Sequence, residues 1–311
     1  MTDPGTTERD CTFDSAAELL GTITTRLGAQ LSHVRLNGVR RDRPALVAVG
    51  HGSRDPRARA ALVRLVERVR ELRPGLDVEL AHIELDAPLL TDVLTTLTPP
   101  HTPPAGAPAA GGRRAVLVPL LFGPGYHVKH DLPAAAAAVP GGRVRIAAPL
   151  GPHPLLVEAL ADRLAEAGWT SADSASRSTG VVLAAAGSRD REGLLAVRRI
   201  AAALSERLGG VPVVPAYASA ATPTVPDAVR TLAARGRHRV AVASCFTAPG
   251  FFASRAAAHA PWIASSPLGA HPALARLVLH RYDQALTGPA PTAMNALAPH
   301  PVPTWREFAS A

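Results

Sequence analysis

The sequence predicts an α/β protein that contains two copies of one domain, each a parallel sheet with helices on both faces. Three observations support this prediction. Short apolar runs alternate with segments of helical periodicity, several motifs occur twice in the same order, and 311 residues of which 47% are hydrophobic suffice for two cores.

The first half shows the alternation of strands and helices most clearly. Short apolar runs predict four strands, and apolar residues that recur every three or four positions predict a helix after each of them. The expected strands span 45–49, 78–85, 115–121 and 144–147, and the expected helices span 62–72, 89–97, 131–138 and 155–167. Such alternation is typical of a parallel sheet, because parallel strands need a crossover connection.

A duplication becomes visible when the two halves are overlaid. The motif Gly52-Ser53-Arg54-Asp55 recurs as Gly187-Ser188-Arg189-Asp190, and the segment PLGPHP at 149–154 recurs as PLGAHP at 267–272. Further matches lie between these two in the same order. Two copies of one fold are therefore expected.

These patterns divide the chain into five parts. We expect an N-terminal extension at 1–44, a first domain at 45–169, a linker at 170–179, a second domain at 180–286 and a flexible Pro- and Ala-rich tail at 287–311. A proline-rich stretch at 98–112 is expected to form a loop inside the first domain.

The charge of the chain favours a small anionic substrate over nucleic acid. Lys and Arg number 33 against 25 acidic residues, which gives a net charge of +8. Lys129 is the single lysine, aromatic residues make up only 4%, and no basic run is interleaved with aromatics. Since nucleic-acid binders usually cluster basic and aromatic residues on one surface, we expect no nucleic-acid partner.

The N-terminus and the cysteines predict a cytoplasmic protein without a membrane partner. Asp3, Glu8 and Asp10 lie where a secretory signal would carry a basic and then an apolar segment. No apolar run reaches the roughly 20 residues that a membrane-spanning helix needs. Cys11 and Cys245 cannot build a disulfide framework or a paired-cysteine metal site.

Three side chains that suit metal chemistry are expected at one edge of the first sheet. His51 follows the first predicted strand, Glu84 ends the second, and His127 follows the third. Ligands of open parallel sheets bind at the carboxyl ends of the strands. Imidazole and carboxylate bind divalent first-row metals, and both accept protons near neutral pH.

The second copy of the domain lacks all three of these side chains. Ala186, Ser219 and Phe252 occupy the equivalent positions, although the flanking motifs are kept. The joint loss indicates that the three residues share one function, which only the first copy retains.

The other histidines near these motifs are expected to have structural roles. His153 and His271 occur in both copies just before a predicted helix, so we expect them to cap or orient a turn. His82 is expected to pack in the core, and His130 is an accessory base or a solvated loop residue. Arg54 either pairs with Asp55 or meets substrate carboxylates.

The motifs HGSRDP, AHIELDAP and LFGPGYHVKHDLP, in this order, resemble the class II chelatases of the sirohydrochlorin chelatase family in their long two-domain form. The resemblance covers about residues 45–286 and implies a cleft between the two copies of the domain, in which the substrate lies. It implies catalytic and metal-binding roles for His51, His127 and Glu84. It also implies substrate contacts in the loops that carry the histidines, at Gly52, Ser53, Arg54, Gly125 and Tyr126.

The resemblance implies insertion of a divalent metal, most readily Fe²⁺, into sirohydrochlorin, with the metal as substrate and no permanently bound cofactor. Two alternatives stay open: Co²⁺ insertion on the route to cobalamin, and a non-catalytic tetrapyrrole or metal carrier. A histidine phosphatase would need an arginine before its histidine, where this chain has Gly50. We expect a monomer, because the duplication already makes an internal pseudo-dimer.

Overall fold

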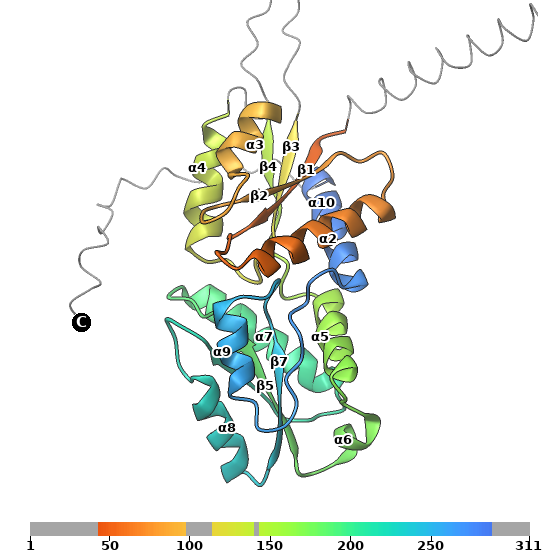
Figure 1. The fold of residues 1–311 in the computed structure, drawn as a ribbon, viewed down its shortest axis with the longest axis vertical. Coiled ribbons are helices and arrows are strands. Elements are labelled where there is room, and N and C mark those ends of the chain that lie inside the picture. The colour runs from red at the N-terminus through yellow and green to blue at the C-terminus, as the bar shows by residue number, and fades with distance from the viewer. Residues whose placement is uncertain (1–42, 98–113, 140–142, 288–311) are drawn as a thin grey trace, which may run out of the picture.

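The computed structural model describes residues 43–97, 114–139 and 143–287. Nearly all of the expected extension, the proline-rich loop and the tail lie outside these residues. The described chain forms two parallel sheets, one in the upper and one in the lower part of Figure 1. Within the described residues, no helix is long and apolar enough to cross a membrane.

The first sheet has the strand order β2-β1-β3-β4, and all neighbouring strands are parallel. Its strands are β1 (Ala45–Gly50), β2 (Val78–His82), β3 (Ala115–Pro119) and β4 (Val144–Ile146). Every residue of β1 and β3 is buried. This burial explains their continuous apolar sequence, because helices cover both faces of the sheet.

Alternate residues of β1 enter two separate cores. Leu46 and Ala48 belong to a core that includes residues of α2 (Pro56–Leu72), and Val47 and Val49 belong to the core on the opposite face. That opposite face is covered by α3 (Leu90–Leu97) and α4 (Leu132–Ala137).

The second sheet repeats this arrangement with the order β6-β5-β7. Its strands are β5 (Thr179–Ala185), β6 (Val213–Tyr217) and β7 (Arg239–Ser244). One face packs on α7 (Arg191–Arg207), and the other on α8 (Val225–Ala234) and α9 (Phe251–Ala258). The predicted fold of two duplicated α/β domains is confirmed.

The repeated Gly-Ser-Arg-Asp motif starts the first long helix of each copy. Asp55 caps α2 by accepting the N–H of Arg57 at 2.9 Å, and Asp190 caps α7 by accepting the N–H of Glu192 at 2.8 Å. The serine of each motif accepts the N–H of the aspartate, at 3.1 Å in the first copy and 3.0 Å in the second. The motif therefore persists in both copies for a local reason, independent of chemistry at the site.

The two halves exchange a helix. α5 (Pro154–Glu166) follows the first sheet in the chain but packs on α7 and β7 of the second half. α10 (Pro272–Thr287) follows the second sheet but packs on α2 and β3 of the first half and on α5 (Figure 1). Leu156, Leu160 and Leu164 of α5 and Leu274, Leu277 and Val278 of α10 consequently belong to one core that runs through both halves.

Polar contacts fix α10 to the first half. The guanidinium of Arg73, at the end of α2, donates to both carboxylate oxygens of Asp283 at 2.6 and 2.8 Å. The Tyr282 hydroxyl, on a fully buried side chain, donates to the carbonyl of Pro44 at 2.6 Å.

The helix exchange cuts across the expected division into residues 45–169 and 180–286. The chain crosses between the sheets at the repeated Pro-Leu-Gly-x-His-Pro segments, before α5 and again before α10. The expected linker at 170–179 contains α6 (Ser171–Ala175) and the first residue of β5.

His153 and His271 cap the two exchanged helices, as expected for structural residues. Nδ1 of His153 accepts the N–H of Leu155 at 3.1 Å, and Nδ1 of His271 accepts the N–H of Ala273 at 3.2 Å. An Nδ1 that accepts a hydrogen bond carries no proton, so each cap requires the neutral imidazole. Burial is the main cause that lowers the pKa of both histidines below the usual value.

We expect acid to weaken this fold through the two histidine caps. Above a pH of about 6.5 both folded and unfolded chains hold these rings neutral, so the contribution is complete. As the pH falls below that value, the unfolded chain binds protons that the folded chain resists, and the free energy of unfolding decreases. His271→Asn retains a capping oxygen without a titrating ring. Urea unfolding between about pH 7 and 5 should give the variant a shallower pH dependence than the wild type, and equal slopes would contradict this role.

Candidate metal centre

A glycine turn brings the loops after β1 and β2 together. Gly52 has a φ of +103°, and a Cβ at this position would lie 1.7 Å from the carbonyl oxygen of Glu84. The N–H of Glu84 donates to the carbonyl of His51 at 3.0 Å. Any side chain at residue 52 would push these loops apart, so the glycine is what places Glu84 beside His51.

A π-helix, η1 (His127–Asp131), presents His127 to the same place. The N–H of Leu132 closes this turn on the carbonyl of His127. Such turns are rare and occur frequently at functional sites. The expected helix at 131–138 is thus preceded by a further turn, which the alanine-rich sequence pattern did not reveal.

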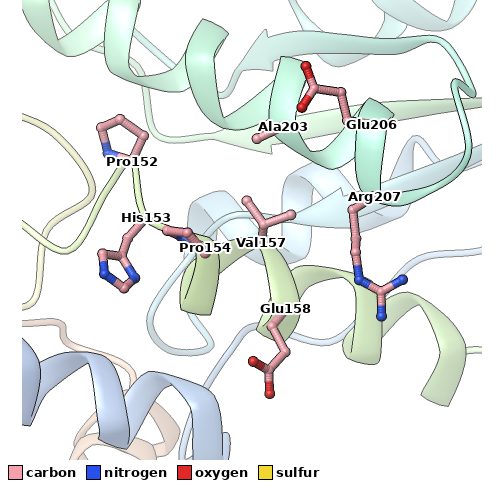
Figure 2. A pocket seen from close by; sticks show the side chains of 8 residues that line it. All are labelled: Pro152, His153, Pro154, Val157, Glu158, Ala203, Glu206 and Arg207. Atoms are coloured by element: carbon pink, nitrogen blue, oxygen red, sulfur yellow. The ribbon is translucent and has the colours of Figure 1, made fainter.

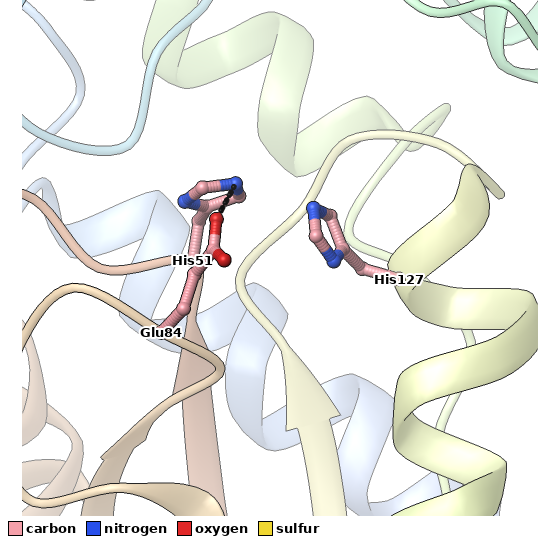
Figure 3. Close-up of side chains that lie close together, drawn as sticks. All are labelled: His51, Glu84 and His127. Atoms are coloured by element: carbon pink, nitrogen blue, oxygen red, sulfur yellow. Dashed lines mark ion pairs between the residues drawn. The ribbon is translucent and has the colours of Figure 1, made fainter. Parts of the chain in front are cut away.

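His51, Glu84 and His127 come together as the sequence predicts (Figure 3). One potential ligand atom from each lies within 4.8 Å of those of the other two. Nε2 of His51 is 3.4 Å from Oε1 of Glu84, and the rings of His51 and His127 meet edge-to-face with centroids 4.7 Å apart. Among the described residues, no other cluster of three or more His, Cys, Asp or Glu side chains has this geometry.

Oxygen partners occupy Nδ1 of both histidines, so the Nε2 atoms are the ones available to bind a metal ion or a proton. Nδ1 of His127 lies 2.5 Å from Oδ2 of Asp131, and Nδ1 of His51 lies 3.3 Å from the carbonyl oxygen of Gly52. Oxygen acceptors at Nδ1 favour the tautomer with its proton there. Two nitrogen lone pairs and one carboxylate then share a small volume, an arrangement that a cation or a proton stabilises.

The centre is open rather than closed. The side chains of His51, Glu84 and His127 are 42%, 45% and 31% exposed. Ligands of one ion, with bonds of about 2.0–2.2 Å, stand at most about 4.4 Å apart, so a small side-chain rotation completes the set. Three ligands leave further coordination positions for a second molecule, as in catalytic metal sites and unlike structural ones.

Sequence reasoning missed Asp131, which orients His127. The two residues are separated by four positions, a spacing at which helical side chains meet. The signal was therefore present in the sequence as His-x-x-x-Asp. This spacing was overlooked because the helix was expected to begin only at residue 131, so that His127 would lie in a loop.

We expect Asp131→Ala to lower metal affinity or turnover by about 10–100-fold, the usual cost of removing the partner that orients a ligating histidine. Asp131→Asn keeps an oxygen acceptor and should cost less. Metal titration and initial rates measure both effects, with Asp92→Asn, on the exposed surface of α3, as a control. A wild-type affinity and rate in Asp131→Ala would show that His127 needs no such support.

The second half preserves the backbone of this centre without its side chains. Gly187 has a φ of +99°, and a Cβ there would lie 1.9 Å from the carbonyl oxygen of Ser219. The N–H of Ser219 donates to the carbonyl of Ala186 at 2.9 Å, as Glu84 does to His51. The equivalence expected from the duplication therefore holds at the level of hydrogen bonds.

The expected substrate-contact residues surround the centre. Ser53 and Gly125 lie at the junction of the halves, because a Cβ on Gly250 would be 3.7 Å from Oγ of Ser53 and a Cβ on Gly125 would be 3.7 Å from Oγ of Ser188. Tyr126 is 62% exposed.

The Arg54 side chain is exposed as well. Asp55, which was one expected partner of Arg54, instead pairs with Arg57 at 2.7 Å.

The remaining histidines of this region lie outside the triad. His82 is fully buried, with Nε2 3.8 Å from the Asp86 carboxylate, and burial lowers its pKa. His130 stacks on Tyr126 with ring centroids 4.6 Å apart. At Gly50, where a histidine phosphatase would carry its arginine, a Cβ would lie 2.9 Å from the Leu62 side chain.

A separate open groove of about 660 Å³ runs along α5 and α7 (Figure 2). It is lined by Pro152, His153, Pro154, Val157, Glu158, Ala203, Glu206 and Arg207. None of these residues belongs to the triad. His153, which lines the groove, caps α5. The groove is therefore part of the packing of α5 on α7.

The fold and the triad define a two-domain α/β protein with an open metal-ligand set on one domain. A family model, CbiX, matches residues 45–167 and again residues 180–285. The chain belongs to the CbiX family, and both of its halves are copies of that domain.

Curated relatives match part of the chain. The chloroplastic sirohydrochlorin ferrochelatase of Arabidopsis thaliana is 32% identical over 127 residues, which is 40% of this chain and 52% of that protein. The sirohydrochlorin cobaltochelatase of Methanocaldococcus jannaschii is 33% identical over 89 residues, which is 29% of this chain and 55% of that protein. The matches thus span about half the length of these relatives.

Solved structures share the two-domain fold. SirB from Bacillus subtilis with Fe³⁺ aligns with a TM-score of 0.60 and 23% identity over 79% of this chain and 96% of that chain. CbiX, described as the terminal enzyme of sirohaem biosynthesis in denitrifying bacteria, aligns with a TM-score of 0.56 and 22% identity over 79% of this chain and all of the other. At these identities the likeness concerns the fold.

Proposed function

We propose that this protein inserts a divalent metal, Fe²⁺ first of all, into sirohydrochlorin. The observation that carries the proposal is the triad of His51, Glu84 and His127, whose ligand atoms lie within 4.8 Å of one another on one copy of the domain only. The names of the relatives from Arabidopsis thaliana and Methanocaldococcus jannaschii agree on sirohydrochlorin as the macrocycle and differ in the metal.

The triad receives the metal and releases it. Two neutral imidazoles and one carboxylate form a donor set that Fe²⁺ and Co²⁺ both accept. Three exposed ligands hold an ion more weakly than a closed site of four, so the ion can pass to the ring nitrogens of the macrocycle. Glu84 also balances part of the charge of the dication.

Metal insertion also requires removal of protons. A divalent ion that enters the ring replaces two pyrrole N–H protons, so the ring loses two protons for each ion gained. His51 and His127 are the bases near that position, with Nε2 available on each. Once the ion has left for the ring, the vacated nitrogens can accept these protons and pass them to water.

The junction between the halves supplies the chemistry that a flat anionic macrocycle needs. Exposed apolar side chains accompany the loops at this junction. Leu85 follows Glu84 and Tyr126 precedes His127, and in the second half Phe251 and Phe252 occupy the positions equivalent to Tyr126 and His127. Exposed apolar surface of this kind marks ligand sites. The net charge of +8 attracts a polycarboxylate, and we expect Arg54, three residues after His51 and exposed, to pair with one of its carboxylates.

The proposal is tested by following the visible spectrum of sirohydrochlorin under anaerobic conditions after addition of protein and metal. We expect several ring equivalents to be metallated per protein molecule, with a higher initial rate for Fe²⁺ than for Co²⁺. A single stoichiometric spectral change without turnover would instead identify a tetrapyrrole or metal carrier.

Cobalt insertion is the second candidate function. It is favoured by the names of relatives from Methanocaldococcus jannaschii and Methanopyrus kandleri, which are sirohydrochlorin cobaltochelatases. A faster rate with Co²⁺ than with Fe²⁺ at equal free metal would replace the first assignment by this one. We propose a monomer in either case, and sedimentation velocity measures that state.

A further inference from the structure

Lys129 links the π-helix of the metal centre to the opposite half of the molecule. Its ammonium lies 2.6 Å from Oδ2 of Asp190 and 2.8 Å from Oε2 of Glu192. Lys129 is two residues from His127 within η1, whereas Asp190 and Glu192 lie at the start of α7 in the second half. It is also the single lysine of a chain that is rich in arginine.

The start of α7, which pairs with Lys129, is held in place by hydrogen bonding and close packing. Asp190 caps α7 through the N–H of Glu192, so its carboxylate is held in place on the helix. The loop before η1 packs against the same turn, since a Cβ on Gly123 would lie 3.3 Å from the Cβ of Ala196 and from the Cα of Gly193. The ammonium holds the pKa of the Asp190 carboxyl below its ordinary value.

The duplicated half provides an internal comparison. Ser254 is the counterpart of Lys129, because its N–H donates to the carbonyl of Gly250 at 2.9 Å, as that of Lys129 donates to Gly125 at 3.0 Å. On that side the counterparts of Asp190 and Glu192 are Asp55 and Arg57, which pair with each other. The lysine link is thus present on the side that carries His127 and absent on the equivalent side without a ligand.

General stability does not account for this difference. Exposed ion pairs contribute little to folding, and the Lys129 side chain is 37% exposed. A role of Lys129 in placing His127 does account for the presence of the link on one side only. A π-turn has one more residue per hydrogen-bonded ring than an α-turn, so its maintenance decides the direction in which His127 points.

We propose that Lys129 is a positioning residue that fixes His127 toward His51 and Glu84 by tying η1 to Asp190 and Glu192 of the second half. The proposal rests on the assigned metal centre. It gives the second half, which has no ligands of its own at the equivalent positions, a direct part in forming the ligand set of the first.

The test is a titration of the full-length protein with Co²⁺ in the absence of tetrapyrrole, followed by the visible absorption of the bound ion. We expect Lys129→Met to weaken Co²⁺ binding by about 5–10-fold, whereas Lys129→Arg, which keeps the positive charge, should retain most of the wild-type affinity. Removal of a positive charge near the ion would by itself tighten binding, so the sign of the change separates positioning from simple electrostatics. Arg68→Met, which breaks an exposed ion pair with Glu71 on α2, is the matched control and should change nothing.

Charge exchange gives a second measurement. Lys129→Glu should weaken Co²⁺ binding further, and the double variant Lys129→Glu with Glu192→Lys should regain most of the affinity, because the link across the halves is rebuilt with opposite polarity. In turnover, Lys129→Met should lower kcat while the KM for the macrocycle stays nearly constant.

Unchanged or tighter Co²⁺ binding by Lys129→Met, or no recovery in the double variant, would overturn the proposal. Failure of the metal centre itself gives a different result. In that case the wild type would bind no Co²⁺, or would bind it equally well after His51→Ala and His127→Ala.

Discussion

Replacement of His51 or His127 by alanine should lower the rate of metal insertion by about 10²–10⁴-fold, the range expected when a positioned base is lost. Each variant removes one of two imidazoles from a ligand set of three, and the second half offers only Ala186 and Phe252 at the equivalent positions. Anaerobic initial rates with saturating metal and sirohydrochlorin measure the effect.

Both variants should remain folded. The two side chains are 42% and 31% exposed, so the free energy of unfolding should change by no more than about 0.5 kcal/mol. His130→Ala, in η1 with His127 but outside the triad, serves as the control and should keep most of the activity. Near-wild-type turnover by both His51→Ala and His127→Ala would refute the assignment of the site.

Glu84→Gln should be milder than either histidine variant, because it removes one charge and keeps the shape of the side chain. If this variant proved the most damaging of the three, the carboxylate would be the principal base and the histidines its supports. The same rate measurements distinguish the two assignments.

The isolated segment 1–170 should fail to fold. Such a fragment keeps α5, whose Leu156, Leu160 and Leu164 pack in the second half, and it lacks α10, which covers the first sheet. The apolar face of α5 and the apolar surface of the first half that α10 covers would then be exposed to water at the same time. We expect aggregation, measured by sedimentation after expression of the fragment alone.

Co-expression of residues 1–170 with residues 171–311 should restore a soluble, active pair, because each fragment carries the helix that the other needs. A soluble monomeric fragment 1–170 with a cooperative unfolding transition would contradict the helix exchange.

A point variant tests the same packing in the intact chain. Leu277→Ala in α10, at a fully buried position, should reduce the free energy of unfolding by about 2–5 kcal/mol. Leu195→Ala in α7, where the side chain is 44% exposed, should change it by about 0.5 kcal/mol or less. Similar losses in both variants would show that α10 contributes no more than surface contacts.

The strands were predictable because both faces of each sheet are buried. Segments such as 45–49 and 115–121 are apolar without interruption, which is the pattern that two covered faces require. The predicted end of the second strand was wrong, because β2 stops at His82 and the chain then turns through Leu85, which has a φ of +65°. A non-glycine residue in this conformation gives no signal in a sequence.

The triad was predictable because parallel sheets gather the carboxyl ends of their strands at one edge. Asp131 and Lys129 were missed, for two different reasons. Asp131 meets His127 through a π-turn that starts earlier than the helical pattern indicates. Lys129 acts across the junction of the halves, and its two partners lie about 60 residues further along the chain.

By itself the sequence determined the α/β class, the duplication and the three candidate ligands, because periodicity, repeated motifs and residue chemistry are local properties. Only the tertiary structure decided which sheet each helix covers. The apolar face of α5 is equally suited to the first or the second sheet, and the same is true of α10. Hydrophobic burial has no direction, so it requires that these faces be covered but does not specify by what. The choice is made by the shape of the packed core and by contacts such as Arg73 with Asp283, which exist only once the chain has crossed between the halves.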